Sequence, residues 1–256
     1  MTTALLTDTV ADGLASALDL ALLWGADGVA LRTVGRDRVP HVNQSAVGAR
    51  LRESELDLLL VDPGLFAPEA APRSAWMNEV AAFDETAAFC HRLGGGLVRC
   101  GALDGGAGAV DALKALGDAA ALSGVRLAVG NERGGAATGA ELAQLLAAVG
   151  HPAVGAEWRP VEALAAGETG GAAALLDAGV SVFAAEVRDA TTDGEPRPPG
   201  EGDVGWSGAL SALEAAGFDG PLVLDFGAAR GGPERVRTVG LRWTTAVIHL
   251  ARAARS

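Results

Sequence analysis

Carboxylates and guanidinium groups stand at the ends of several short apolar runs in this sequence. Glu132 ends VRLAVGNE, Asp225 lies near the end of GPLVLDF, and AEWRP holds Glu157 and Arg159 two residues apart. Residues two apart in a strand point to the same face, so Glu157 and Arg159 would share a surface. A carboxylate at a pocket can act as a general acid or base. The pattern therefore indicates a site that could transfer protons.

Another apolar run, VFAAEVRD, contains Glu186 and Arg188 with the same parity. A charge so deep in an apolar strand needs a reason, which favours Glu186 as a pocket residue. Arg188 could bind an anionic or hydroxylated ligand, or form a structural salt bridge. Arg32, which closes the second run, is favoured as a ligand-binding residue, whereas Arg99, within the fourth run, is left undecided. Asp225 could equally be the ion-pair partner of an arginine.

The composition excludes several kinds of chemistry and partner. The chain has no tyrosine, and Lys114, its only lysine, lies in an apparent helix, so a Schiff-base mechanism has one poor candidate. A net charge of -12 argues against nucleic acid binding. No apolar run is long enough to span a bilayer, and no signal peptide is recognisable. The two cysteines form no CxxC pair, so we expect a cytoplasmic protein.

Eight β-like runs alternate with amphipathic helical stretches along the 256 residues. Most are continuously apolar, as parallel strands covered on both faces should be. No GxGxxG follows the first run, which argues against an open doubly wound sheet. The sequence therefore predicts one (β/α)8 TIM barrel over residues 1–256, with 191–206 as its longest loop. The runs are 4–10, 27–34, 56–64, 96–103, 125–132, 153–160, 180–189 and 220–226.

The C-terminal part of the chain resembles a known family. It carries Gly-Glu-Gly-Asp at 200–203, Trp206, and Gly-Phe-Asp-Gly-Pro at 217–221 before the last run. This pattern is similar to the C-terminal signature of the xylose isomerase-like TIM barrels. That superfamily includes sugar phosphate isomerases/epimerases and the endonuclease IV-type AP endonucleases. LWGADGVALR, LLVDPGLF and VRLAVGNERG resemble its earlier units, so the similarity covers nearly the whole chain.

The resemblance implies a divalent metal held by residues at the ends of strands five to eight. In this chain, those positions fall on Gly130, Arg159, Glu186 and Asp225, and only Asp225 keeps a matching type. A fixed guanidinium repels a dication, so we expect a degraded site with no bound Mn²⁺ or Mg²⁺. Arg159 would replace the cation, within hydrogen-bonding reach of Glu186 or Asp225. The alternative is a displaced carboxylate site formed by Glu132, Glu157, Glu186 and Asp225.

Two functions remain open at this stage. The first is a sugar isomerase/epimerase-like enzyme that acts on a small polyhydroxylated or phosphorylated substrate by carboxylate-assisted proton transfer. Its catalytic residues would be Glu132 as general base, Glu186 and Asp225. The second is a non-catalytic barrel that binds or senses a small carbohydrate-like molecule. AP endonuclease activity ranks third, because the chain is acidic and lacks the expected histidines.

In either leading function the ligand-binding residues would be Arg32, Asn131, Glu157, Arg159 and Arg188. The oligomeric state is open.

Overall fold

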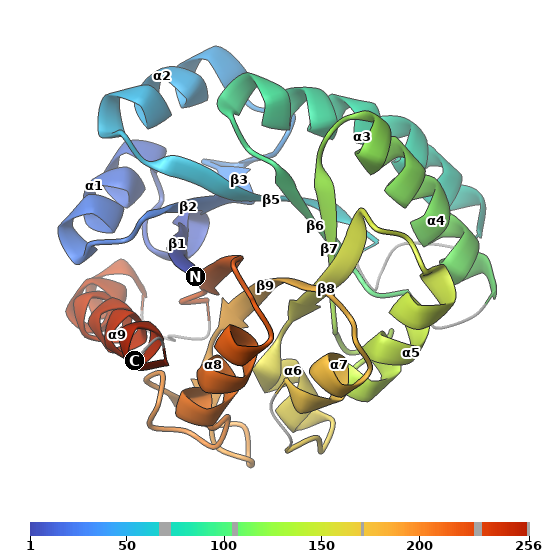
Figure 1. Ribbon diagram of the computed structural model, residues 1–256. Coiled ribbons are helices and arrows are strands. Elements are labelled where there is room, and N and C mark those ends of the chain that lie inside the picture. The colour runs from blue at the N-terminus through green and yellow to red at the C-terminus, as the bar shows by residue number, and fades with distance from the viewer. Residues whose placement is uncertain (67–72, 104–106, 170–171, 228–231, 255–256) are drawn as a thin grey trace.

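Eight parallel strands close into a barrel in this computed structural model, which describes residues 1–66, 73–103, 107–169, 172–227 and 232–254. β12 pairs with β1, with Thr2 opposite Pro221, and this pairing closes the ring (Figure 1). Each predicted run overlaps one barrel strand, so the predicted (β/α)8 barrel is confirmed. The strands are β1 (Thr2–Leu6), β2 (Gly28–Leu31), β5 (Asp57–Leu65), β6 (Leu97–Gly101), β7 (Arg126–Gly130), β8 (Val154–Trp158), β9 (Val182–Val187) and β12 (Pro221–Leu224).

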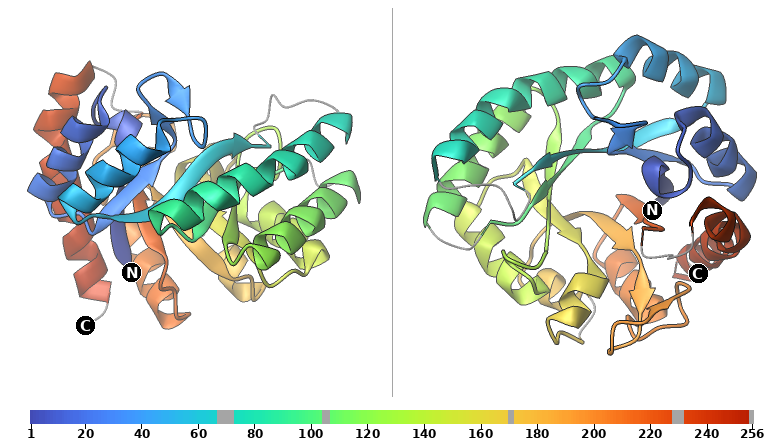
Figure 2. Two further views of the ribbon diagram at one scale, coloured as in Figure 1. Left: turned by 90° about the horizontal axis from the view of Figure 1, so that it is seen from above. Right: turned by 180° about the vertical axis from the view of Figure 1, so that it is seen from behind.

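Helices surround the barrel and separate most consecutive strands (Figures 1 and 2). Their ends follow local rules of the sequence: Gly25 closes the first helix in a left-handed conformation, with φ 76°. Thr138 and Glu141 form a capping box at the start of the fifth. The helices are α1 (Leu14–Trp24), α2 (Gln44–Ser54), α3 (Arg73–Leu93), α4 (Ala107–Leu122), α5 (Gly139–Val149), α6 (Pro160–Ala165), α7 (Ala173–Asp177), α8 (Trp206–Ala215) and α9 (Gly232–Ala254).

The structure corrects the predicted bounds of the first strand. We predicted a strand over residues 4–10, but β1 ends at Leu6 and a 3₁₀ turn, η1 (Thr7–Thr9), follows it. The Thr9 hydroxyl donates a hydrogen bond to the Leu6 carbonyl at 2.7 Å. Such local side-chain bonds compete with strand pairing, which explains why the chain turns here.

Two small hairpins lie outside the barrel. β3 (Thr33–Val34) pairs with β4 (Asp37–Arg38), and β10 (Asp189–Ala190) pairs with β11 (Pro196–Arg197). The second strand of the β10–β11 hairpin lies within segment 191–206, which we predicted as the longest loop. In the left panel of Figure 2 the blue β3–β4 hairpin lies at the end of the barrel opposite the N-terminus.

The side chains inside the barrel form two tiers. The lower tier is a small apolar cluster that includes Leu60, Ala184 and Val223. Asp62, Glu186 and Asp225 each lie two residues after one of these three apolar residues. Because side chains alternate along a strand, the three acids also point into the barrel. The barrel therefore changes from apolar to charged toward the carboxyl ends of its strands.

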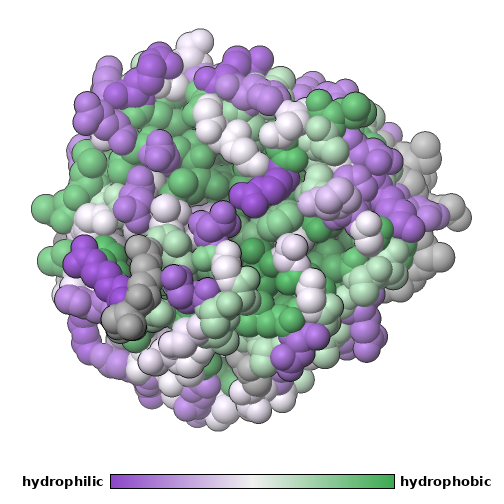
Figure 3. Space-filling model, in the orientation of Figure 1, coloured by the Kyte–Doolittle hydropathy of each residue, from purple (hydrophilic) through white to green (hydrophobic). Residues whose placement is uncertain are grey.

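The outer face of the barrel packs against the helices through a second, larger apolar core. On the face shown in Figure 3, hydrophilic side chains lie around the rim of the molecule, and several lie near its middle among apolar atoms. Of the helices in the described residues, none combines the length and the apolar character that crossing a bilayer requires.

Candidate active site

The residues singled out from the sequence gather at the carboxyl ends of the barrel strands. Glu157 and Glu186 lie within β8 and β9, whereas Asn131, Glu132, Arg159, Arg188 and Asp225 directly follow β7, β8, β9 and β12. Arg32 follows β2. Glu132, Glu157, Arg159, Glu186 and Asp225 therefore lie near one end of the barrel. In barrels of this type, that end carries the active site.

Arg159 lies at the centre of this group and holds two of its carboxylates. Its Nη1 donates to Glu132 Oε2 at 2.5 Å, and its Nε donates to Glu186 Oε1 at 3.3 Å. Its Nη2 is also 3.3 Å from Glu186 Oε1. The prediction that Arg159 would reach Glu186 or Asp225 is confirmed for Glu186. One guanidinium thus neutralises carboxylates from two different strand ends.

A second arginine, Arg99, lies deeper in the barrel. Its side chain is only 4% exposed, and its Nε donates to Glu157 Oε1 at 3.0 Å, with a second, shorter contact from Nη2 to the same oxygen. Its Nη1 also reaches Asp62 Oδ2 at 3.4 Å, and its Nη2 lies 3.8 Å from Glu186. Arg99 therefore forms the lower layer of the charged cluster, below Arg159.

The pKa values of the carboxylates in the cluster are shifted in different directions. Burial would raise the pKa of Glu186, but the charges of Arg159, Arg99 and Arg188 outweigh it and lower that pKa to about 2. Burial raises the pKa of Asp225, and the negative charge of Glu186 adds to this shift. The pKa of Glu132 is also raised by burial, despite its bond to Arg159. Neighbouring carboxylates with pKa values pushed apart are typical of acid–base sites.

Asn131 holds the backbone of Arg159 in place. Its side-chain oxygen accepts from Arg159 N at 2.8 Å, and its amide nitrogen donates to the carbonyls of Arg159 at 2.9 Å and Ala137 at 3.0 Å. Asn131 and Glu157 are both completely buried. The role of ligand contact that we predicted for them stays a prediction, and this geometry assigns them the support of Arg159 and Arg99.

Several buried polar atoms in the cluster have no hydrogen-bond partner among the described residues. They include Glu132 Oε1, Glu186 Oε2 and the Nε of Arg188. Arg188 also contacts Glu162 at 3.4 Å and Glu186 Oε2 at 3.6 Å. Buried polar atoms seldom stay unpaired, so these acceptors and this donor suit the hydroxyl groups of a bound molecule or ordered water.

Arg32 is engaged by a residue that sequence analysis missed. Its Nε and Nη2 donate to the two oxygens of Asp8 at 2.8 and 3.1 Å, and the ligand-binding role predicted for Arg32 stays a prediction. Asp62 was missed as well, and Arg99 was left undecided. The sequence carried the same signal for Asp8 and Asp62 as for the acids that were found, because both are carboxylates near the carboxyl ends of apolar runs.

The segment after β9 is fastened by Asp189. Its carboxylate accepts from the backbone N–H groups of Ala190, Gly200, Gly202 and Val204, at 2.9, 2.8, 3.1 and 3.3 Å. Asp189 therefore caps the loop that follows β9. The indole of Trp206 also donates to the carbonyl of Arg188 at 3.1 Å. The Gly-Glu-Gly-Asp segment is thus tied to the strand end that carries Glu186 and Arg188.

Replacement of Gly202 by alanine should loosen this loop. A Cβ at Gly202 would lie 2.2 Å from Asp189 Oδ1 and 2.7 Å from the Ala190 carbonyl, so the carboxylate has to move. We expect Gly202→Ala to destabilise the protein by about 2 kcal/mol, because several buried hydrogen bonds weaken together. Gly208→Ala is the matched control: Gly208 lies in α8 with nothing within 4 Å, so alanine should stabilise by up to about 1 kcal/mol. Equal melting temperatures for the two variants would contradict this.

The residues present do not fit the metal site that the resemblance implies. A Cβ at Gly130 would lie 2.7 Å from Arg159 Cδ and 3.2 Å from Glu157 Oε2, so the Arg159 side chain fills the space of a fifth-strand acid. Among the described residues, no group of three or more His, Cys, Asp or Glu side chains has the arrangement of a metal site. A guanidinium between the carboxylates also opposes a dication electrostatically. We therefore assign no metal-dependent step to this donor set.

Comparison with known proteins places the chain in a family. The family model described as "Xylose isomerase-like TIM barrel" matches residues 18–247. The chain therefore belongs to the xylose isomerase-like TIM barrel family. No curated protein sequence matches it.

Solved structures with the same fold include proteins of several kinds. A xylose isomerase domain protein from Alicyclobacillus acidocaldarius subsp. acidocaldarius shares 20% identity, with a TM-score of 0.75 and 100% of both chains covered. A D-psicose 3-epimerase in the presence of D-fructose shares 12% identity, with a TM-score of 0.77 and 98% and 99% coverage. A xylose isomerase-like TIM barrel/4-hydroxyphenylpyruvate dioxygenase fusion protein shares 20% identity, with a TM-score of 0.77. The match covers 95% of this chain and 42% of that longer protein. At these identities, the likeness shows the fold alone.

Proposed function

We propose that the carboxyl end of the barrel binds a small polyhydroxylated or phosphorylated molecule and transfers a proton next to its carbonyl group, as sugar isomerases and epimerases do. The observation that carries this proposal is the Arg159 guanidinium between Glu132 and Glu186. It puts a fixed positive charge beside a carboxylate of raised pKa. The family supports the proposal, since solved structures of the same fold include sugar epimerases.

The proposed proton transfer uses three groups of the cluster. Glu132, as carboxylate, takes the proton from the carbon beside the substrate carbonyl, and the C–H electron pair forms the double bond of an enediolate. Arg159 hydrogen-bonds the oxygen that becomes negative, which is the role of a preorganised electrostatic group. Return of a proton from Asp225 to the opposite face of the same carbon gives the epimer. Delivery of the proton to the former carbonyl carbon instead, together with transfer of the neighbouring hydroxyl proton to the negative oxygen, gives the isomer.

A second candidate function is binding without catalysis. One observation favours it: both Glu132 and Glu186 are already ion-paired with Arg159, which reduces their strength as bases. A barrel of this kind would bind or sense a carbohydrate-like molecule through Arg188, Asp225 and the unpaired buried atoms. The two candidates differ in one measurable property, the exchange of a substrate C–H proton with solvent.

Isotope exchange in D₂O tests the proposal directly. The protein, treated with a chelator, is incubated with D-fructose, D-psicose or D-fructose 6-phosphate, and deuterium at the carbons beside the carbonyl is followed by NMR. We expect exchange that survives chelation and falls by about 100-fold or more in Glu132→Gln, as loss of a general base does. Glu53→Gln, at an exposed carboxylate on α2, is the control and should retain full exchange.

The other outcomes separate the remaining explanations. Exchange that appears only after addition of Mn²⁺ would contradict the assigned role of Arg159. Sugar binding without any exchange would support the non-catalytic candidate and reject the enzymatic one. Exchange that Glu132→Gln leaves unchanged would reject Glu132 as the base.

A further inference from the structure

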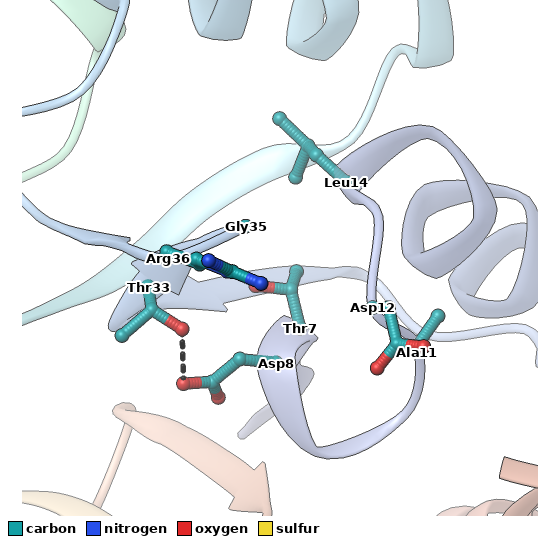
Figure 4. Close-up of a pocket in the computed structure, with 8 residues that line it drawn as sticks. All are labelled: Thr7, Asp8, Ala11, Asp12, Leu14, Thr33, Gly35 and Arg36. Carbon is teal, nitrogen blue, oxygen red and sulfur yellow. Dashed lines mark hydrogen bonds between the residues drawn. The ribbon is translucent and has the colours of Figure 1, made fainter.

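A cavity of about 510 Å³ lies beside the charged cluster, at the carboxyl ends of β1 and β2. Its walls come from η1, the start of α1 and the β3–β4 hairpin (Figure 4). The size is that of a small-molecule site. None of the residues assigned to the proposed proton transfer lines this cavity.

One wall of the cavity is rigid and electrically neutral. Asp8 accepts from Arg32 Nε and Nη2 at 2.8 and 3.1 Å, and from the Thr33 hydroxyl at 2.8 Å. The charge of Asp8 is therefore cancelled by Arg32, and its carboxylate is fixed in position. The hydroxyl oxygens of Thr7 and Thr33, whose protons go to Ala30 O and Asp8, face the cavity as acceptors. This wall suits the hydroxyl groups of a ligand.

Two other lining residues carry charges that no described residue balances. Asp12 and Arg36 are both exposed, and neither has a hydrogen bond or ion pair with any described residue, including each other. In Figure 4 the two side chains come from different walls, with the Arg36 guanidinium directed across the cavity above Thr7. As far as the described residues show, the cavity thus offers an anion and a cation without partners on separate walls, beside a neutral hydrogen-bonding surface.

We propose that this cavity binds a polyhydroxylated zwitterion, a molecule that carries both an ammonium and a carboxylate group. The ammonium pairs with Asp12, the carboxylate pairs with Arg36, and the hydroxyl groups donate to Asp8, Thr7 and Thr33. Such a ligand leaves no unbalanced charge in the cavity, whereas a purely cationic or anionic ligand leaves either Arg36 or Asp12 without a partner. Amino sugar acids have this chemistry. The inference concerns binding alone and is independent of proton transfer at Glu132.

Four probes of nearly equal size test each charge separately. They are 2-amino-2-deoxy-D-gluconate with both charges, D-glucosamine with the ammonium alone, D-gluconate with the carboxylate alone, and D-glucitol with neither. Binding is measured by calorimetry at about pH 6, where the amino groups are charged. We expect the zwitterion to bind most tightly, with a loss of about two- to fivefold for each missing charge, as exposed ion pairs give.

Two variants assign the charges to residues. Asp12→Asn should remove the gain in affinity that comes from the ammonium group and keep the gain from the carboxylate. Arg36→Gln should remove the gain from the carboxylate and keep the gain from the ammonium group. Asp19→Asn on α1 and Arg50→Gln on α2 are controls at other surface charges and should change nothing. Both test residues are exposed, so the variants should fold.

Each remaining result overturns the proposal. Equal binding of all four probes would make the cavity a general polyol site, and absence of binding would show that it is not a site for this class. Preference for D-gluconate or D-glucosamine over the zwitterion would show that one of the two charges does not take part. Because no turnover is needed, a failure of the isotope-exchange experiment leaves this result unaffected.

Discussion

Replacement of Arg99 by methionine should destabilise the protein by about 3–5 kcal/mol. The guanidinium is almost fully buried, and its loss leaves the completely buried Glu157 carboxylate without its principal partner. Removal of one member of a buried ion pair typically has a cost of this size, because the other charge stays desolvated. Urea unfolding monitored by circular dichroism, with linear extrapolation to water, measures the change.

A double variant distinguishes loss of charge balance from loss of packing. Arg99→Met combined with Glu157→Gln removes both charges, and should recover at least half of the lost stability. Arg126→Met is the control: Arg126 is exposed on the neighbouring strand β7 and stacks 4.7 Å from the Phe183 ring, which is worth about 1 kcal/mol. A double variant no more stable than Arg99→Met alone would show that the charge on Glu157 is not the cause.

Replacement of Arg159 by alanine should cost about 3 kcal/mol at pH 8 and less at pH 5. The Glu186 pKa of about 2 lies below its value of about 4.3 in an unfolded chain. Ionised Glu186 therefore contributes stability that is present above pH 4.3 and is lost as the pH falls toward 2. Without Arg159, the pKa values of Glu132 and Glu186 rise. At pH 5 part of these carboxylates is protonated and avoids the repulsion, whereas at pH 8 all are ionised.

Thermal melts of the parent and the variant at the two pH values check this. Arg159→Lys keeps the positive charge, and should reduce the deficit while losing the second hydrogen bond. Arg50→Ala is the control, because the Arg50–Glu53 pair on α2 is exposed and should contribute less than about 1 kcal/mol at either pH. A deficit of the same size at pH 5 and pH 8 would be inconsistent with a charge-balancing role for Arg159.

The fold was predictable because parallel barrel strands leave a strong pattern in the sequence. Runs such as VRLAVGNE and GPLVLDF are apolar on both faces and bounded by glycine. The two short hairpins were missed, since two-residue strands carry no hydrophobic period. The predicted end of the first strand, residue 10, was too far along the chain. The hydrogen bond from Thr9 to Leu6 that lies where the strand ends leaves no trace in the hydrophobic pattern.

The candidate site was predictable only in part. Arg159 and Glu186 were placed together correctly, because strand parity and the position of strand ends fix which side chains meet. Asp62 and Asp8 were missed, and their partners Arg99 and Arg32 come from other strands. Pairing across neighbouring strands depends on register, which the sequence does not display. The sequence likewise does not show that the Arg159 side chain lies over Gly130, where it fills the space that an acidic side chain at that position would need.

The pairing of β1 with β12 has a consequence for synthesis of the chain on the ribosome. One edge of β1 binds β2 soon after it emerges, but the other edge stays unpaired until residues 221–224 have been synthesised. At about 5–20 residues per second, the open edge of β1 stays exposed for tens of seconds. An unpaired strand edge of this kind can pair with other chains. The nascent chain is therefore most prone to aggregation just before its last strand arrives, and a stop codon before residue 221 would leave that edge permanently open.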